Sequence, residues 1–216
     1  SAIDGLSFVQ GRVDQGMSFS SGGYVDIPAS PSLANQQFTI EAWVRPEGPG
    51  PNDDSTGSII VEQNVDNTHV AASLTWRATD HRFSFYFGDV STDVLISQNT
   101  FAPGHFYHVA GTYDGTVFRL IVDGVVEGEL QLSKAIAYST HDWTIGSTPF
   151  DIRSQGFPRT WNGVIDEVSI YNRALELQEL QAIFDAKSGG KCAPPVLRVE
   201  KSHSGSFIKG QPAATF

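Results

Sequence analysis

Hydrophobic and polar residues alternate along most of this chain with the two-residue period of β-strands. The pattern is plainest in Phe106–Leu130, where three runs rich in β-branched and aromatic residues are separated by Asp114-Gly115 and Asp123-Gly124. An Asp-Gly pair readily adopts the positive φ angles of a tight hairpin turn. The segment therefore predicts a three-stranded antiparallel meander, with a tight turn at Asp123-Gly124 and a longer loop or bulge at Asp114-Gly115.

The same period predicts further strands on both sides of the meander. They are Met17–Phe19, Tyr24–Ile27, Phe38–Val44, Ser58–Glu62, Val70–Trp76, Arg82–Phe87, Val94–Ser97, Asp142–Gly146 and Trp161–Tyr171. Pro46–Gly57, rich in proline and glycine, and Thr148–Arg159 are predicted to be long loops. Only Glu176–Ala186 has a helical period, and this amphipathic helix is expected to cap an edge of the strands.

Composition and charge limit the class of protein. The 216 residues include 40% hydrophobic residues and 21 glycines, which is typical of many short strands joined by tight turns. The net charge of −10 and the scattered lysines and arginines argue against a nucleic-acid partner, which needs a basic patch. No run approaches the roughly 20 apolar residues of a membrane-spanning helix. The single cysteine, Cys192, excludes an intrachain disulfide, and its state is left open between an inert thiol and a pairing with another domain.

The chain is predicted to contain one main domain and the start of another. Residues 1–186 hold all the strand patterns and the helix. Residues 187–195, KSGGKCAPP, are typical of a linker, because Gly-Gly and Pro-Pro bracket a short polar stretch. Residues 196–216 are expected to form the first strand region of a following β-domain in a larger multidomain protein.

Five motifs occur in an order that resembles a known family. GRVDQGMSFSSGGYVDIP, FTIEAWVRP, FYHVAGTYDG, RLIVDG and GVIDEVSIYNRALELQELQAI are similar to the laminin G-like jelly-roll family of the concanavalin A-like lectin/glucanase superfamily. The resemblance covers Gly11–Phe184, and Tyr107-His108 stands where the family has paired histidines. The tail LRVEKSHSGSFIKGQ resembles the start of an immunoglobulin-like repeat of large bacterial surface and secreted proteins. The resemblance implies an all-β, concanavalin A-like jelly-roll sandwich of two antiparallel sheets, one concave and one convex, with one short C-terminal helix.

The fold alone does not define an activity, because its superfamily includes lectins, adhesion modules and glycoside hydrolases. Retaining glycosidases of this fold carry Glu-x-Asp-x-Glu on one strand, which places two carboxyl groups about 5 Å apart. The chain has no such spacing; Glu127 and Glu129 alternate correctly but lack the central aspartate. G-x-S-x-G and H-E-x-x-H are also missing. The protein is therefore predicted not to be an enzyme, although carboxylates from separate strands could still meet in a cleft.

Sugar binding requires an exposed aromatic ring flanked by planar polar side chains. Two sets of residues in the sequence meet this description. The first is Trp76, Arg77 and His81, with Asp80 beside them; the second is Trp161, Asn162 and Arg153, with Arg159 beside them. Burial of both tryptophans would instead favour a module that binds no sugar.

The family resemblance also implies a structural calcium ion. Its ligands here would be Asp166 and the backbone carbonyls of Gly22 or Gly23, since calcium prefers oxygen ligands. The alternative is that Asp166 caps a turn or pairs with a cation such as Arg173. A second calcium could use Asp53-Asp54 or Asp66-Asn67, but turn formation is the favoured interpretation of those aspartates.

Together these observations predict a non-catalytic extracellular recognition module of a secreted or surface-exposed bacterial protein. Its expected partners are an extracellular carbohydrate or a cell-surface protein, and the flanking domains of its own chain. The alternative is a structural or protein-adhesion module without sugar binding, and a glycoside hydrolase is the third interpretation.

Overall fold

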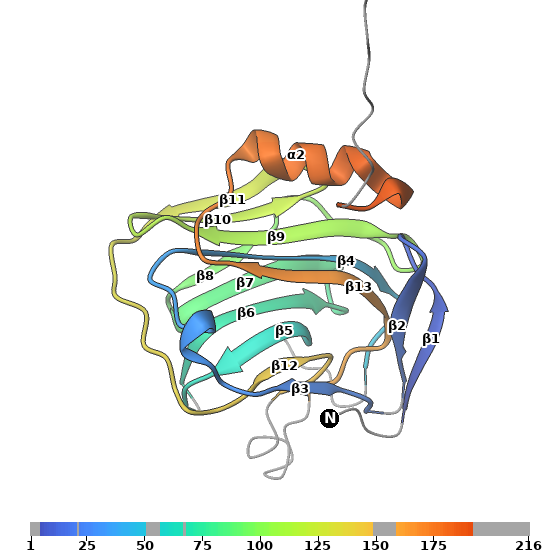
Figure 1. The fold of residues 1–216 in the computed structure, drawn as a ribbon, viewed down its shortest axis with the longest axis horizontal. Coiled ribbons are helices and arrows are strands. Elements are labelled where there is room, and N and C mark those ends of the chain that lie inside the picture. The colour runs from blue at the N-terminus through green and yellow to red at the C-terminus, as the bar shows by residue number, and fades with distance from the viewer. Residues whose placement is uncertain (1–4, 21, 51–56, 67, 149–158, 192–216) are drawn as a thin grey trace, which may run out of the picture.

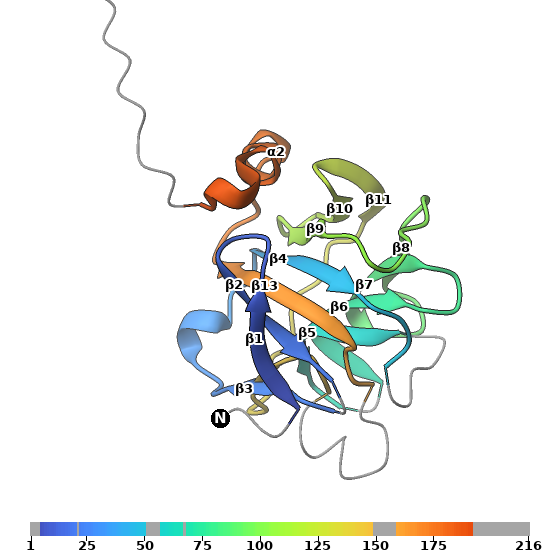
Figure 2. The ribbon, with the colours of Figure 1, turned by 90° about the vertical axis from the view of Figure 1, so that its right-hand side faces the viewer.

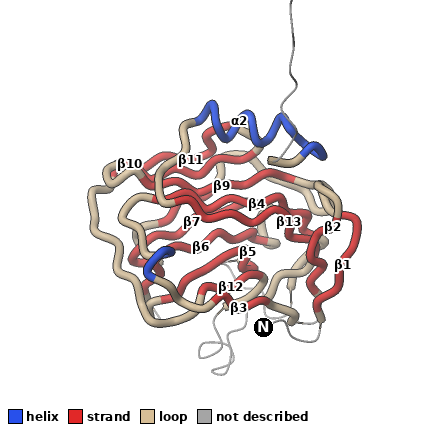
Figure 3. The backbone as a smooth tube through the Cα atoms, in the orientation of Figure 1, coloured by secondary structure: helices blue, strands red, loops and turns tan. Residues whose placement is uncertain are grey.

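The computed structural model describes residues 5–20, 22–50, 57–66, 68–148 and 159–191, which form two antiparallel β-sheets packed face to face (Figures 1 and 3). In spatial order the seven-stranded sheet contains β1 (Leu6–Gln10), β2 (Gln15–Phe19), β13 (Gly163–Tyr171), β4 (Phe38–Pro46), β9 (Tyr107–Tyr113), β10 (Val117–Val122) and β11 (Val125–Gln131). The six-stranded sheet contains β3 (Val25–Ile27), β12 (Trp143–Ile145), β5 (Ser58–Asn64), β6 (His69–Arg77), β7 (Arg82–Asp89) and β8 (Val94–Ile96). The predicted sandwich is confirmed.

The core lies between the two sheets and follows the strand alternation. On β4 the side chains of Ile40, Ala42 and Val44 are fully buried, as their shared face predicts. Aromatic rings fill the centre, where the rings of Phe85 and Phe118 from opposite sheets lie 4.6 Å apart between centroids. This packing fixes the backbone from which the loops at both ends of the strands project.

The central meander forms as predicted. Strands β9, β10 and β11 pair in sequence, and Asp123 and Gly124 turn the chain with φ angles of 51° and 76°. The register of β10 against β11 shifts between Leu120 and Ile121, which places a bulge in this second hairpin. The loop at Asp114-Gly115 is the longer one.

Two features of the fold differ from the sequence-based expectation. The hydrophobic pattern did not predict β1, which among the described strands pairs only with β2, at the edge of the seven-stranded sheet. The helix α2 (Leu177–Ala186) was expected to cap an edge, and this is wrong. It covers the outer face of the seven-stranded sheet (Figure 2). There Leu180 packs against Ala110 and Ile121, and Phe184 stacks on Trp43.

The chain remains attached to the sandwich beyond the helix. Lys187–Gly189 form the short 3₁₀ helix η2, and the Nζ atom of Lys191 lies 2.6 Å from a carboxylate oxygen of the buried Glu41. The predicted linker, 187–195, thus begins with residues that contact the domain. The predicted strand at 196–216, the residue Cys192 and most of the two long predicted loops lie outside the described residues. Within the described ranges, no helix has the length and apolar character that crossing a membrane requires.

Candidate functional site

The structure brings the two predicted sugar-binding sets together at the end of β6. The rings of Trp76 and Trp161 meet edge to face, with centroids 6.5 Å apart and planes 71° apart. Both side chains are buried, with exposed fractions of 1% and 0%. Neither indole is exposed as the sugar-stacking role requires, and the ligand-binding roles of Trp76 and Trp161 stay predictions. Trp76 lies in register with the core residue Phe83, so strand alternation directs its ring inward.

The polar members of the two sets lie around these buried rings. The guanidinium group of Arg77 lies 3.0 Å from a carboxylate oxygen of Asp80. The imidazole of His81 is exposed and stacks on Trp76 with a centroid distance of 5.6 Å and an interplanar angle of 10°. Asn162 donates a side-chain hydrogen bond of 3.3 Å to the backbone oxygen of Pro49. Arg153 lies outside the described residues, and the ligand-binding roles of Arg77, His81 and Asn162 stay predictions.

The residues predicted to hold calcium do not come together. Oδ2 of Asp166 accepts a 2.9 Å hydrogen bond from the backbone N–H of Val13, so the carboxylate caps the turn between β1 and β2. Gly22 and Gly23 lie at the other end of β2, where Gly22 faces Thr160. The alternative role for Asp166, a turn cap, is the one that the structure supports. Calcium binding itself stays a prediction, without this set of ligands.

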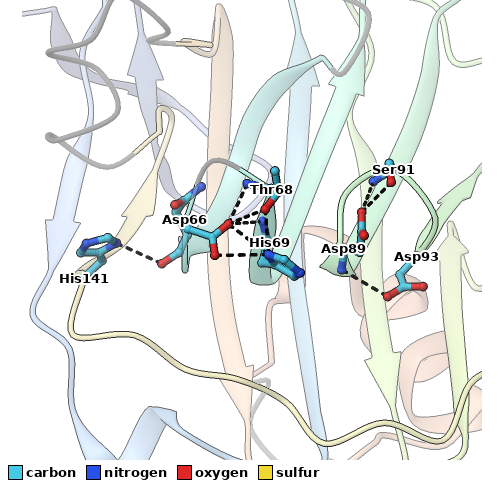
Figure 4. Close-up of polar contacts among 8 residues, drawn as sticks. Asp66, Thr68, His69, Asp89, Ser91, Asp93 and His141 are labelled. Atoms are coloured by element: carbon cyan, nitrogen blue, oxygen red, sulfur yellow. Dashed lines mark hydrogen bonds and ion pairs between the residues drawn. The ribbon is translucent and has the colours of Figure 1, made fainter.

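A polar cluster occupies the opposite end of the six-stranded sheet, where the β5–β6 and β7–β8 loops lie side by side (Figure 4). We call it the rim cluster; it consists of Asp66, Thr68, His69, Asp89, Ser91, Asp93 and His141. His69 opens β6 and lies directly opposite Asp89, the last residue of β7. Strand pairing therefore places the carboxylates of two separate loops on one edge.

Asp66 is held by its own loop. Its Oδ1 atom accepts hydrogen bonds from the backbone N–H groups of Thr68, at 2.7 Å, and His69, at 2.9 Å, and from the Thr68 hydroxyl at 2.8 Å. The backbone and side-chain bonds from Thr68 foremost, and then the side-chain hydrogen bond from His69, hold the pKa of the Asp66 carboxyl far below its usual value. The side chains of Asp66 and His69 are 54% and 46% exposed, so an ionised carboxylate faces solvent here.

Asp89 repeats this arrangement in the neighbouring loop. Its Oδ1 atom accepts hydrogen bonds of 2.6 Å from the Ser91 hydroxyl and 2.8 Å from the Ser91 backbone N–H, and both lower the pKa of the Asp89 carboxyl. Asp93 braces the loop by accepting a 3.2 Å bond from the backbone N–H of Asp89 and a 2.7 Å bond from Lys134. Burial raises the pKa of Asp93, but the hydrogen bond from Lys134 and smaller contributions outweigh it and leave the pKa lowered.

A third Asp-x-Ser/Thr loop shows which part of the arrangement is only a turn. In the β9–β10 loop, Oδ1 of Asp114 accepts bonds from the backbone N–H and hydroxyl of Thr116, at 2.9 and 2.8 Å. Its second oxygen, Oδ2, lies 3.4 Å from a nitrogen of Arg119. The predicted turn-forming role of Asp66 is thus confirmed. Among the described contacts, no arginine or lysine pairs with the second oxygens of Asp66 and Asp89, whereas Oδ2 of Asp93 accepts the bond from Lys134.

Sequence reasoning missed most of the rim cluster. It identified Asp66 but assigned no role to Asp89, Asp93, His69 or His141. The threefold recurrence of Asp-x-Ser/Thr between strand patterns was the available signal. Within the described part of the chain, no three His, Cys, Asp or Glu side chains are grouped as a metal site would require. Of the residues predicted for a second calcium ion, Asp53, Asp54 and Asn67 lie outside the residues that the structure describes.

Two buried glutamates elsewhere, Glu62 and Glu41, already have hydrogen-bond and ion-pair partners within the protein. Glu62, on β5, is fully buried and accepts hydrogen bonds of 2.7 Å from Ser73 and 3.1 Å from Arg159. Glu41 lies on the other sheet and pairs with Lys191 and His108. The two carboxylates thus belong to different sheets, and each is fully buried and bound to basic side chains.

The architecture is that of a jelly-roll sandwich with elaborated strand-end loops, a class that contains many binding domains. The chain belongs to the concanavalin A-like lectin/glucanases superfamily, whose laminin G-like family model matches residues 19–181. The resemblance predicted from the five motifs is therefore confirmed. A search of curated protein sequences returns no match.

Several solved structures share the fold. Domain 4 of AbnA, an extracellular GH43 arabinanase from Geobacillus stearothermophilus solved with arabinotriose, superposes with a TM-score of 0.65 and 17% identity, over 82% of this chain and 80% of that chain. The binding domain of Paraclostridial Mosquitocidal Protein 1 has a TM-score of 0.65 and 16% identity, over 86% and 47%. The binding domain of Botulinum Neurotoxin DC in complex with SialylT has a TM-score of 0.60 and 11% identity, over 86% and 45%. The chain spans about half the length of the two toxin domains, and at these identities the likeness concerns the fold.

Proposed function

We propose that this chain is a non-catalytic carbohydrate-binding module that acts outside the cell and binds sugar hydroxyls at the rim cluster. One observation carries the proposal: Asp66 and Asp89 lie on one exposed edge, each with Oδ1 fixed by its own loop. The fold is shared with an arabinanase domain solved with arabinotriose and with a toxin domain solved with SialylT, which supports a carbohydrate ligand.

The rim offers the chemistry that a sugar hydroxyl requires. Oδ2 of Asp66 receives one described hydrogen bond, from Nδ1 of His69 at 3.2 Å, and Oδ2 of Asp89 has none among the described residues. Each oxygen can accept a hydroxyl proton in a charge-assisted hydrogen bond. Because the turns already fix both carboxylates, binding loses little side-chain entropy. The imidazole of His69 adds a ring nitrogen that can donate or accept.

The assignment as non-catalytic has its own support. A glycosidase needs two carboxyl groups that face a common substrate. Glu41 and Glu62 are on different sheets and bound to basic side chains, and Asp66 and Asp89 are kept ionised by their loops. A carboxyl with a lowered pKa is a poor general acid at neutral pH.

The first test is a glycan array with the wild-type chain and the double variant Asp66→Asn/Asp89→Asn. Asparagine retains an Oδ1 acceptor for each turn but removes the charge and the second acceptor. Loss of a charge-assisted hydrogen bond predicts at least about tenfold weaker glycan binding. The matched control is Asp114→Asn, which alters the same turn motif on the other sheet and should leave binding unchanged.

Two results would contradict the proposal. One is that the double variant keeps the wild-type affinity, and the other is that the wild-type chain binds no glycan. Repeating the array with a chelator tests the proposal that calcium has a structural role: a cation-dependent site loses binding or thermal stability, and a cation-independent one keeps both.

A structural or protein-adhesion module is the second candidate function. The burial of both Trp76 and Trp161 favours it, because neither indole offers a sugar-stacking surface in this conformation. A silent glycan array combined with saturable binding to a cell-surface protein would support this candidate.

A further inference from the structure

We propose that Trp76 is a second sugar-binding surface, closed in the free protein by the imidazole of His81, which a pyranose ring displaces. The inference rests on the proposed function, because it assumes a carbohydrate ligand. It concerns the opposite end of β6 from the rim cluster. Strand β6 is nine residues long, from His69 to Arg77, and the two sites lie at its two ends, so they are distinct.

The imidazole stacks on the indole at a centroid distance of 5.6 Å and so covers part of the face on which a sugar ring would stack. It lies nearly parallel to the indole, at an interplanar angle of 10°, and it is the exposed member of the pair. Stacking of this kind is how the apolar C–H face of a pyranose binds tryptophan. Trp76 is 1% exposed because other side chains cover its ring, and the imidazole of His81 is one of them.

The cover can leave without breaking a hydrogen bond of its own. Among the described contacts, the His81 ring takes part in the stack with Trp76 and in no hydrogen bond. The backbone of His81 is anchored separately, because its oxygen accepts a 2.6 Å bond from the N–H of Phe101. Rotation about the side-chain bonds of His81 can therefore uncover the indole while the turn stays in place.

The indole, by contrast, is fixed. Its Nε1 atom donates a 3.2 Å hydrogen bond to the backbone oxygen of Phe101, and its edge packs against Trp161. Phe101 thus holds both the indole and the backbone of the covering residue. A surface that keeps its place when its cover leaves is preorganised for a ligand.

The backbone at His81 supports a role for its side chain. His81 has a φ of 56°, in the left-handed region that favours glycine and, after it, asparagine. A histidine at this turn position costs backbone free energy that glycine would avoid. The stacking contact with Trp76 is the favourable interaction that the imidazole makes to offset this backbone cost.

Two charged residues lie close in sequence to Trp76 and His81. Arg77 and Asp80 form an ion pair of 3.0 Å, and among the described residues Nε of Arg77 and Oδ1 of Asp80 have no hydrogen-bond partner. Both atoms are buried, so this donor and this acceptor stay without a partner in the described part of the free protein. The ligand class that an uncovered indole suits is a gluco- or galacto-configured chain, whose pyranose rings present an apolar C–H face.

The first measurement needs no sugar. All four tryptophans of the chain are at most 2% exposed, so iodide should quench little of the wild-type fluorescence. His81→Gly suits the positive φ and removes the cover, and it should create a quenchable component from one tryptophan. His81→Asn, which also tolerates this φ, should act in the same direction. His105→Gly, at another exposed histidine, is the control and should change nothing.

The second measurement is calorimetric titration with cellotetraose and with β-1,4-galactotetraose. Because the sugar no longer competes with the imidazole, His81→Gly should bind at least one of them about 2- to 12-fold more tightly, the range that an aromatic stack corresponds to. The bound tetrasaccharide should also protect the new component from iodide. Unchanged quenching in both variants would overturn the inference, and so would weaker binding, which would make the imidazole itself the contact.

The two proposals fail separately. If the rim double variant loses glycan binding while His81→Gly gains none, the covered site falls and the rim proposal stands. If neither the wild type nor His81→Gly binds any sugar, both fall. If both hold, combining the rim and His81 substitutions should give additive effects, since the sites are far apart.

Discussion

Replacing Lys191 with methionine is expected to lower the free energy of unfolding by about 3 kcal/mol, because it leaves a buried carboxylate without its cation. Glu41 is fully buried, and its Oε1 atom lies 2.6 Å from Nζ of Lys191. The ammonium group also donates 2.6 Å and 2.5 Å hydrogen bonds to the Ser169 hydroxyl and the Glu167 backbone oxygen. Methionine preserves the length of the side chain but supplies neither charge nor donor.

The pH dependence of this effect follows from the pKa of Glu41. Burial raises that pKa, but the hydrogen bond from His108, the charge of Lys191 and smaller contributions outweigh it and leave the pKa below its usual value of 4.5. A carboxyl with a lowered folded-state pKa stabilises the fold above its unfolded pKa, and this stability is lost as the pH falls through the folded pKa. Removing Lys191 raises the folded pKa, so Lys191→Met should begin to lose stability at a higher pH than the wild type.

Urea denaturation at neutral pH and across the acid range measures both effects. The control is Arg173→Met, which breaks the exposed ion pair with Glu179 and should change the free energy of unfolding far less than Lys191→Met does. Glu41→Gln/Lys191→Met removes both charges and should recover part of the loss. If Lys191→Met and Arg173→Met have equal free energies of unfolding, the ion pair between Lys191 and Glu41 does not hold the C-terminal end of the domain in place.

Short-range rules were sufficient for most of the fold. Alternation predicted β4, because its aliphatic residues share one face and must be buried together. Asp-Gly predicted the turn at Asp123, because few other pairs accept two positive φ angles. Alternation does not say which sheet a strand joins, and it is weak at an edge. β1, with Phe8 65% exposed, therefore escaped prediction.

The helix shows the same limit from another side. Its apolar stripe predicted that one face is buried, but the surface that receives it is built from residues distant in sequence. Strand β4, which carries Trp43, is paired along both edges by β13 and β9. Only the outer face of the sheet is therefore free at Trp43, and Phe184 of the helix stacks there. Periodicity specifies what an element buries, and only the assembled sheet specifies where.

The candidate site was harder to predict, because exposure is a property of the assembled fold. Trp76 and Trp161 carry the side chain that sugar recognition uses, yet strand register turns Trp76 inward and His81 covers it. Asp166 has suitable chemistry for calcium, but the β1–β2 turn uses its carboxylate. The rim cluster can be recognised only from the strand pairing. This pairing places His69 opposite Asp89, although the β6–β7 hairpin separates the two residues in sequence.

Gly111→Ala is expected to be the most damaging of the conservative core substitutions, with a loss of about 3 kcal/mol in the free energy of unfolding. A Cβ atom at Gly111 would lie 2.3 Å from two carbons of the Phe85 ring, far inside van der Waals contact. The ring cannot retreat, because Phe118 lies 4.6 Å away between centroids and Phe38 packs against its edge. The clash therefore forces the two sheets apart at the centre of the core.

Gly128→Ala is the matched control for this clash, since it lies in the same sheet and its Cβ would meet Leu95 at an ordinary 3.4 Å. Its effect should lie within about 1 kcal/mol of zero, because alanine also restricts the unfolded chain. Adding Phe85→Leu to Gly111→Ala makes room for the new methyl group and should recover part of the loss, which urea denaturation of the three variants measures. Equal stabilities of Gly111→Ala and Gly128→Ala would mean that the sheets tolerate a wider spacing, and that the contact between Gly111 and Phe85 does not set it.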